Sequence, residues 1–174
     1  MFIRGGDYEQ TVLSVDPAVS SNPGADRTAL VTLGKTATNQ IHCLEAFARR
    51  VSAPELMQLI DDADRRQRPD AILFESNAAF AGLRDLLARH ARFGPKIQSV
   101  VQTRDKASRV AAFSVPVENG TFRLRGAGPN HVDPGQQELW DEMTSFPLGE
   151  HDDLLDAAAT GVAWMLERRE PRIW

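Results

Sequence analysis

The chain has 174 residues, of which 42% are hydrophobic and 25% are charged, the composition of an ordinary globular domain. Its net charge at pH 7 is −4, and its single cysteine, Cys43, excludes an internal disulfide and favours a reducing compartment. No apolar run approaches the roughly 20 residues that cross a bilayer, and no signal-peptide pattern opens the chain. We therefore expect one intracellular domain without a membrane partner.

The charges are segregated along the chain. Residues 89–125 carry eight Lys and Arg side chains against only Asp105 and Glu118, whereas residues 126–160 carry eight acids and no Lys or Arg. For most of these residues the simplest interpretation is a solvated helix face. A basic stretch beside an acidic one is also the pattern of a polyanion-binding surface next to a cation site.

The N-terminal third predicts an antiparallel meander. After an irregular lead-in over residues 1–10, residues 11–15 form an apolar run that ends at Asp16, because a proline follows and cannot continue a central strand. Two further strands are expected over residues 28–33 and 41–48. Their short connections favour antiparallel neighbours.

Helices and strands then alternate. A helix capped by Ser52 is expected to end near Gln67, followed by a strand over 71–74 that ends at Glu75. A helix over 80–87, a strand over 97–101 and a helix over 106–113, broken by Pro116, are expected next. A small strand over 121–124, a short helix over 136–143 and a final apolar helix complete the chain. The expected fold is α/β, with a mixed sheet of five strands or slightly more. An antiparallel meander is followed by parallel crossovers, with helices on both faces, the order of ribonuclease-H-like folds.

Carboxylates are concentrated where the last helix begins. The segment 149–157 reads Gly-Glu-His-Asp-Asp-Leu-Leu-Asp-Ala. One or two of these acids suit a helix N-terminus, where Asp152 is the best N-cap candidate and Asp156 fits the helix dipole. The excess calls for a further reason, and Asp153 is then the better candidate for a metal ligand.

Two other acids are expected at the same place. Asp16 and Glu75 each end a buried strand, and ligands collect at the carboxyl ends of parallel strands. Asp16 alone is equally well explained as a turn residue, but Glu75 after an apolar run needs a partner. With Asp152 or Asp153 these residues form an all-oxygen site for Mg²⁺ or Mn²⁺, and two such ions about 4 Å apart support phosphodiester hydrolysis.

Three motifs resemble one family. Val-Asp-Pro-Ala at 15–18, Phe-Glu-Ser-Asn at 74–77 and His-Asp-Asp-Leu-Leu-Asp-Ala at 151–157 are similar to the nuclease domain of the large terminase subunit of tailed bacteriophages, over residues 11–166. The resemblance implies a ribonuclease-H-like endonuclease that cuts concatemeric double-stranded phage DNA in the cytoplasm of the bacterial host. Its catalytic acids would be Asp16, Glu75 and Asp153, with Asp152 as a further metal ligand, and Lys106 and Arg109 would contact DNA phosphates.

The resemblance also implies partners, namely the terminase ATPase domain, the small terminase subunit and the portal. The sequence contains no ATPase motor, so we expect a single nuclease domain over 1–174 with a basic tail at 168–174, either excised or separately encoded. Two alternatives stay open. One is another ribonuclease-H-like nuclease, such as a Holliday-junction resolvase or an RNA–DNA hybrid nuclease, and the other is a non-catalytic DNA-binding or assembly module.

Overall fold

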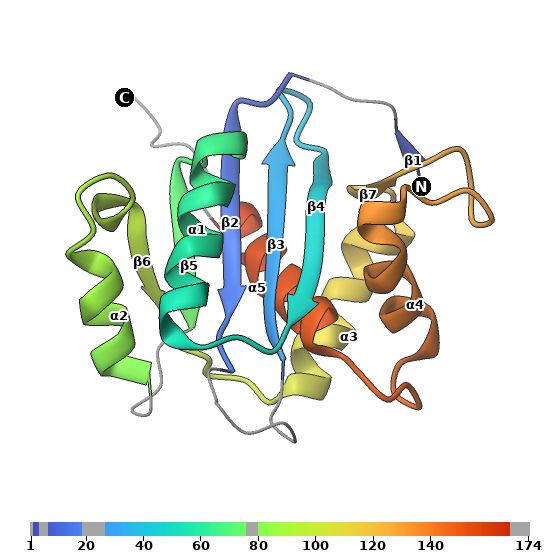
Figure 1. Cartoon of the computed structure of the whole chain (residues 1–174). Helices are drawn as coiled ribbons and strands as arrows, with labels where there is room; N and C mark the ends of the chain where they lie inside the picture. Colours follow the sequence, from blue (N-terminus) through green and yellow to red (C-terminus); the bar gives the residue numbers. More distant parts are fainter. Residues whose placement is uncertain (1, 4–6, 19–26, 76–79, 168–174) are drawn as a thin grey trace.

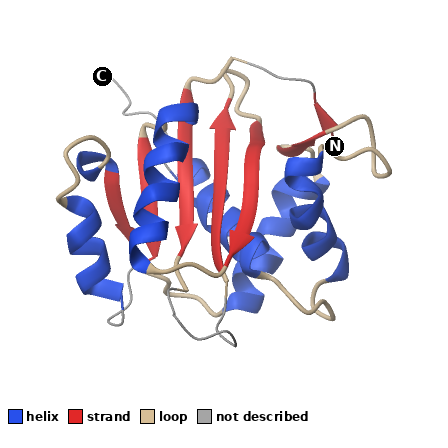
Figure 2. Cartoon of the chain, in the orientation of Figure 1, coloured by secondary structure: helices blue, strands red, loops and turns tan. Residues whose placement is uncertain are grey.

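The computed structural model describes residues 2–3, 7–18, 27–75 and 80–167. Within these ranges the chain forms three layers, with a mixed sheet between two layers of helices (Figures 1 and 2). The predicted α/β fold is therefore confirmed. Among the helices of these ranges, none has both the length and the apolar character needed to span a bilayer.

Seven strands form the sheet within the described ranges. They are β1 (Phe2–Ile3), β2 (Gln10–Asp16), β3 (Thr28–Lys35), β4 (Ile41–Arg49), β5 (Ala71–Glu75), β6 (Ile97–Val100) and β7 (Phe122–Arg125). Across the sheet their order is β1-β7-β4-β3-β2-β5-β6. Strands β2, β3 and β4 pair antiparallel, as the meander predicted. Strand β5 lies parallel between β2 and β6, so β2 and β5 end at the same edge of the sheet.

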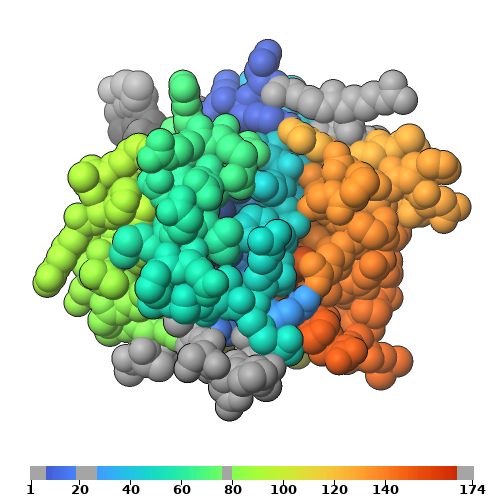
Figure 3. Space-filling model, viewed as in Figure 1, coloured from blue at the N-terminus to red at the C-terminus, as the bar shows by residue number. Residues whose placement is uncertain are grey.

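Two helices cover one face of the sheet. Helix α1 (Ala53–Gln67) begins with the predicted capping box, in which Ser52 and Glu55 satisfy each other's backbone N–H groups. With α2 (Ala81–Ala88) it buries an apolar cluster against the sheet that includes Phe74 and Phe93. In the space-filling view from this side, α1 and α2 lie over the sheet, and residues of α4, which packs with the cluster on the opposite face, are visible at the right margin (Figure 3).

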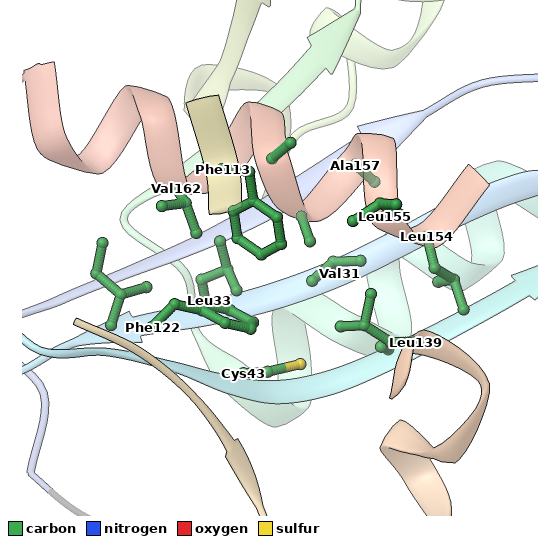
Figure 4. Close-up of a cluster of buried hydrophobic side chains, with 14 of the residues drawn as sticks. Val31, Leu33, Cys43, Phe113, Phe122, Leu139, Leu154, Leu155, Ala157 and Val162 are labelled. Carbon is green, nitrogen blue, oxygen red and sulfur yellow. The ribbon is translucent and has the colours of Figure 1, made fainter. Parts of the chain in front are cut away.

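The opposite face carries α3 (Lys106–Glu118), α4 (Gln137–Ser145) and α5 (Asp153–Glu167). Figure 4 shows the cluster that these helices bury against the sheet, with Leu154 and Val162 of α5 close to Val31 and Leu33 of β3. The rings of Phe113 and Phe122 meet edge to face at 4.9 Å between centroids. Each large side chain buried in this way stabilises the fold by about 1.5–3 kcal/mol.

Two sequence predictions differ from the structure. Helix α3 does not break at Pro116 but continues to Glu118, because a proline one turn from a helix end leaves few carbonyls without donors. Pro116 has no N–H to donate to the carbonyl of Ala112, a residue that is exposed to solvent. Phe2–Ile3, expected in an irregular lead-in, pairs in parallel with β7 and forms the edge strand β1.

The close packing of α5 on the sheet depends on Gly161. A Cβ atom at this position would lie 2.6 Å from Cδ1 of Leu33 and 3.2 Å from Cβ of Ser14. We expect Gly161→Val to lower the free energy of unfolding by about 2–3 kcal/mol, since overpacking forces a shift of the helix. Chemical denaturation checks this.

The matched control is Gly82→Val on α2, where a Cβ atom would have nothing within 4 Å. Its effect should stay within about 0.5 kcal/mol. Equal losses from both variants would contradict the assignment of Gly161 to a close contact.

Candidate metal centre

Three carboxylates meet at the carboxyl edge of the sheet, the lower edge in Figure 1. Asp16 ends β2, Glu75 ends β5, and Asp156 lies in the first turn of α5. One ligand oxygen from each lies within 4.8 Å of the others. The parallel pairing of β2 with β5 places the first two side by side, and the packing of α5 beneath them brings the third.

Burial and mutual repulsion change the acidity of these groups. The pKa of Asp16 is raised to about 8, first by burial and then by the charges of Glu75 and Asp156. Burial and the charge of Asp156 also raise the pKa of Glu75. Shifts of this kind mark a site where negative charge is concentrated without enough compensation.

The donor set suits a hard divalent cation. All three candidate ligands are carboxylates, and Asp156 is 5% exposed. Oxygen ligands without a nearby cysteine or histidine are what Mg²⁺ and Mn²⁺ prefer, and a divalent charge would remove the repulsion that raises the pKa of Asp16. The residues therefore fit the divalent metal that the sequence predicted, and the predicted ligands Asp16 and Glu75 both belong to the cluster.

Two cations of α3 face this cluster. The guanidinium of Arg109 donates two hydrogen bonds to Asp156, one of them 2.9 Å from Nε to Oδ1. The ammonium of Lys106 lies 2.7 Å from Oδ1 of Asp152 and 3.9 Å from Oδ2 of Asp156. Both side chains, expected to contact DNA phosphates, thus point at the acids of the centre.

The third predicted ligand, Asp153, lies beside the cluster rather than within the group of three. Its Oδ2 accepts from Nε of Arg27 at 3.2 Å, and the same guanidinium donates to Glu138 and to Oε1 of Glu142 at 2.9 Å. The charge of Asp153 nevertheless contributes to the raised pKa of Asp16, so the two carboxylates are close enough to interact.

Glu142 fixes the start of α5. Its side chain is 4% exposed, and its Oε2 accepts from the backbone N–H of Leu155 at 2.9 Å. Its pKa is raised by burial, while the bond from Leu155 and the charge of Arg27 act in the opposite direction. Arg27 and Glu142 together tie the beginning of β3 to α4 and to the turn that carries Asp156.

The sequence pattern explains Asp156 as a helix-dipole residue and gives no sign that Arg27 and Glu142 support the centre. It gives no sign either that Gln102 hydrogen-bonds Glu75. One signal pointed to Asp156. The other residues of segment 154–159 are small or apolar, the composition of a buried helix, in which an acid needs a partner. The roles of Arg27 and Glu142 depend on contacts across more than 100 positions, or between helices, that no local pattern encodes.

Four cations of the basic stretch at 89–125 serve two different sites, Lys106 and Arg109 at the metal centre and two others at α1. Arg92 and Lys96 pair with the buried Asp64 of α1 at 3.0 and 2.7 Å, and Arg92 also binds Asp61. These cations therefore hold α1 against the segment between α2 and β6. The tail at 168–174 and the Ser-Asn pair at 76–77 lie outside the described residues.

The sequence matches a family profile described as "Terminase RNaseH-like domain" over residues 13–163. No curated protein matches the chain. This match covers the second half of β2 and all the strands from β3 to β7, and it includes the three carboxylates of the centre.

Several solved structures share the fold. The large terminase nuclease from the thermophilic phage G20c has a TM-score of 0.58 at 14% identity, covering 93% of this chain and 90% of that one. The yeast mitochondrial Holliday junction resolvase Ydc2 has a TM-score of 0.57 at 13% identity, covering 88% and 77%. The fowlpox virus Holliday junction resolvase has a TM-score of 0.55 at 14% identity, covering 90% and 98%. At these identities the likeness concerns the fold alone.

The raised pKa of Asp16 predicts the pH dependence of stability without metal. The pKa of Asp16 is about 8 in the folded protein, against an ordinary value of 3.8. Protonation of Asp16 therefore stabilises the fold fully below pH 3.8, and this stabilisation is lost as the pH rises through 8. We expect the free energy of unfolding in EDTA to fall by about 2–3 kcal/mol between about pH 5.5 and 8.5. Saturating Mn²⁺ should flatten the profile, as denaturation at each pH will show.

Asp16→Asn should remove most of this pH dependence in EDTA, and Mn²⁺ should no longer raise the stability of the variant. Asp7→Asn is the matched control, because Asp7 is exposed and precedes β2 at the opposite end of the sheet. A profile that Asp16→Asn and Asp7→Asn leave equally steep would contradict the assignment of the shift to Asp16.

Proposed function

The chain belongs to the terminase RNaseH-like domain family, and on that premise we propose that it is a metal-dependent endonuclease that hydrolyses phosphodiester bonds of double-stranded DNA. The observation that carries the proposal is the meeting of Asp16, Glu75 and Asp156 within 4.8 Å at the carboxyl edge of a ribonuclease-H-like sheet. A module without catalysis gains nothing from a cluster of like charges that raises the pKa of its own members.

Asp16, Glu75 and Asp156 would hold the first metal ion. Asp153, and Asp152 at the N-terminal end of α5, are the candidates for a second ion, because both lie at the margin of the same cluster. When bound, divalent ions supply an activated water and positive charge at the scissile phosphate. The protein supplies fixed positions for these carboxylates, through two strand ends and one helix.

Lys106 and Arg109 would neutralise the phosphate. Both side chains now pair with carboxylates that a metal ion would neutralise in their place. Once the charges of Asp152 and Asp156 are met by metal, the two cations are positioned at the same edge of the sheet to bind phosphate oxygens. Arg27 has a different task, because its three acidic partners hold it in place beside α4 and α5.

The biological setting that we propose is the cutting of concatemeric phage DNA during genome packaging. The chain would then act in the cytoplasm of the bacterial host, together with a terminase ATPase domain, a small terminase subunit and a portal. Junction resolution is the second candidate, because the fold is shared about equally with two proteins whose names describe Holliday junction resolvases. Substrate choice separates the two.

Cleavage of supercoiled plasmid tests the proposed activity. With Mn²⁺ or Mg²⁺ the wild type should nick and then linearise the plasmid, and EDTA should abolish the reaction. Asp16→Asn and Asp156→Asn should each reduce the rate at least about 100-fold, because the loss of a ligand removes several kcal/mol of charge stabilisation in the transition state. Asp7→Asn, which removes the same charge far from the cluster, should cut normally.

A four-way junction and an RNA–DNA hybrid complete the assay. Faster cutting of the junction than of the plasmid would favour a resolvase, and faster cutting of the hybrid would favour a hybrid nuclease. Folded wild-type protein that binds Mn²⁺ yet leaves every substrate intact would refute the proposed function.

A further inference from the structure

A groove of about 400 Å³ opens beside the metal centre. Its walls are the segment that follows β6, one side of α3 and the second half of α5. Strand β6 is the last strand at its edge of the sheet, and it is only partly buried, so α5 does not extend under it. The groove thus lies between α3, α5 and the segment that follows β6, at this edge of the sheet.

The groove is continuous with the metal centre. Arg109 lines it and also binds Asp156. Gln102 lines it as well, donates to the hydroxyl of Thr160 at 2.8 Å and hydrogen-bonds the carboxylate of Glu75. Along α5, Asp156, Thr160 and Trp164 recur every fourth residue, so they share one face of the helix and extend about 12 Å along it. A ligand held at the carboxylates therefore reaches directly into the groove.

The walls combine apolar surface with positive charge. Trp164, Phe113 and Pro116 line the groove, Val101 and Leu166, which also line it, are 69% and 42% exposed, and Glu167 is the acid among the lining residues. Arg104 and Arg109 add two cations near the end that faces the centre. Aromatic and apolar surface beside arginine is the combination that binds single-stranded nucleic acid, where bases stack and cations meet the phosphates.

We propose that this groove holds an unpaired base of the DNA strand next to the phosphate at the metal centre. The proposal rests on the proposed function and specifies its substrate. In a paired duplex the bases are stacked inside and would leave the apolar walls without a partner, whereas a base turned out of the duplex fits in a cavity of this size. Gln102 and Thr160 supply hydrogen-bonding groups for its edge, and Arg104 supplies a cation for the neighbouring phosphate.

A matched pair of alanines on α3 allows a direct test. Ala112 lines the groove and Ala111 does not, although both are exposed helix positions. Ala112→Trp should fill the groove, and Ala111→Trp should add the same ring outside it. The probe is a short, fluorescently labelled oligothymidine with phosphorothioate linkages, which resist hydrolysis, and binding is followed by anisotropy in Mn²⁺ beside a fully paired duplex of the same backbone.

Ala112→Trp should weaken binding of the single strand about tenfold, the scale of one lost base-stacking contact. Binding of the duplex and of Mn²⁺, measured by calorimetry, should change less than about twofold, and Ala111→Trp should change none of the three. Unchanged single-strand affinity, the result expected if a protein partner occupies the groove, would overturn the proposal, as would equal losses for both DNAs. The plasmid assay distinguishes this outcome from failure of the proposed function, in which the wild type would show no metal-dependent cutting.

Discussion

The repulsion among Asp16, Glu75 and Asp156 is the constraint on which the rest of this structure depends. Three carboxylates within 4.8 Å oppose folding, and burial, followed by the charges of Glu75 and Asp156, raises the pKa of Asp16. The fold meets it with cations from two directions. Arg109 approaches Asp156 from α3, while Arg27 binds the neighbouring Asp153 from the start of β3.

This arrangement makes the cations and the metal competitors for the same charge. In the protein without metal, Arg109 partly neutralises Asp156, so a divalent ion must replace that interaction before the guanidinium can serve a phosphate. The same replacement couples metal binding to the position of α3. Because α3 also forms one wall of the groove, the metal, the scissile phosphate and the adjacent base would bind to adjoining parts of one surface.

The framework that holds the centre is rigid on both sides. Gly161 lets α5 lie close against Ser14 and Leu33, so the helix that carries Asp156 has a fixed distance from the sheet. Glu142 then fixes the first turn of the same helix by accepting from the backbone of Leu155. Preorganisation of this kind is what a metal site needs, because ligands that must move lose affinity.

The strand ends could be predicted from the sequence, because the proline after Asp16 and the end of the apolar run at Glu75 are local signals. The choice among the acids of the last helix could not. Capping preferences distinguish Asp152 from Asp153 only by their positions at the helix start. The packing of α5 on the sheet, by contrast, orients Asp156 toward the cluster. The rotation of a helix about its axis depends on contacts between residues far apart in the chain. Local periodicity therefore does not determine which acid of one helical turn faces the cluster.

Soaking crystals of the protein in Mn²⁺ and computing an anomalous difference map would test the central claim most directly. We expect a peak between the carboxylates of Asp16, Glu75 and Asp156, accompanied by separation of the Arg109 guanidinium from Asp156. A map of well-ordered crystals without a peak at this position, or with Mn²⁺ bound only by other residues, would contradict it.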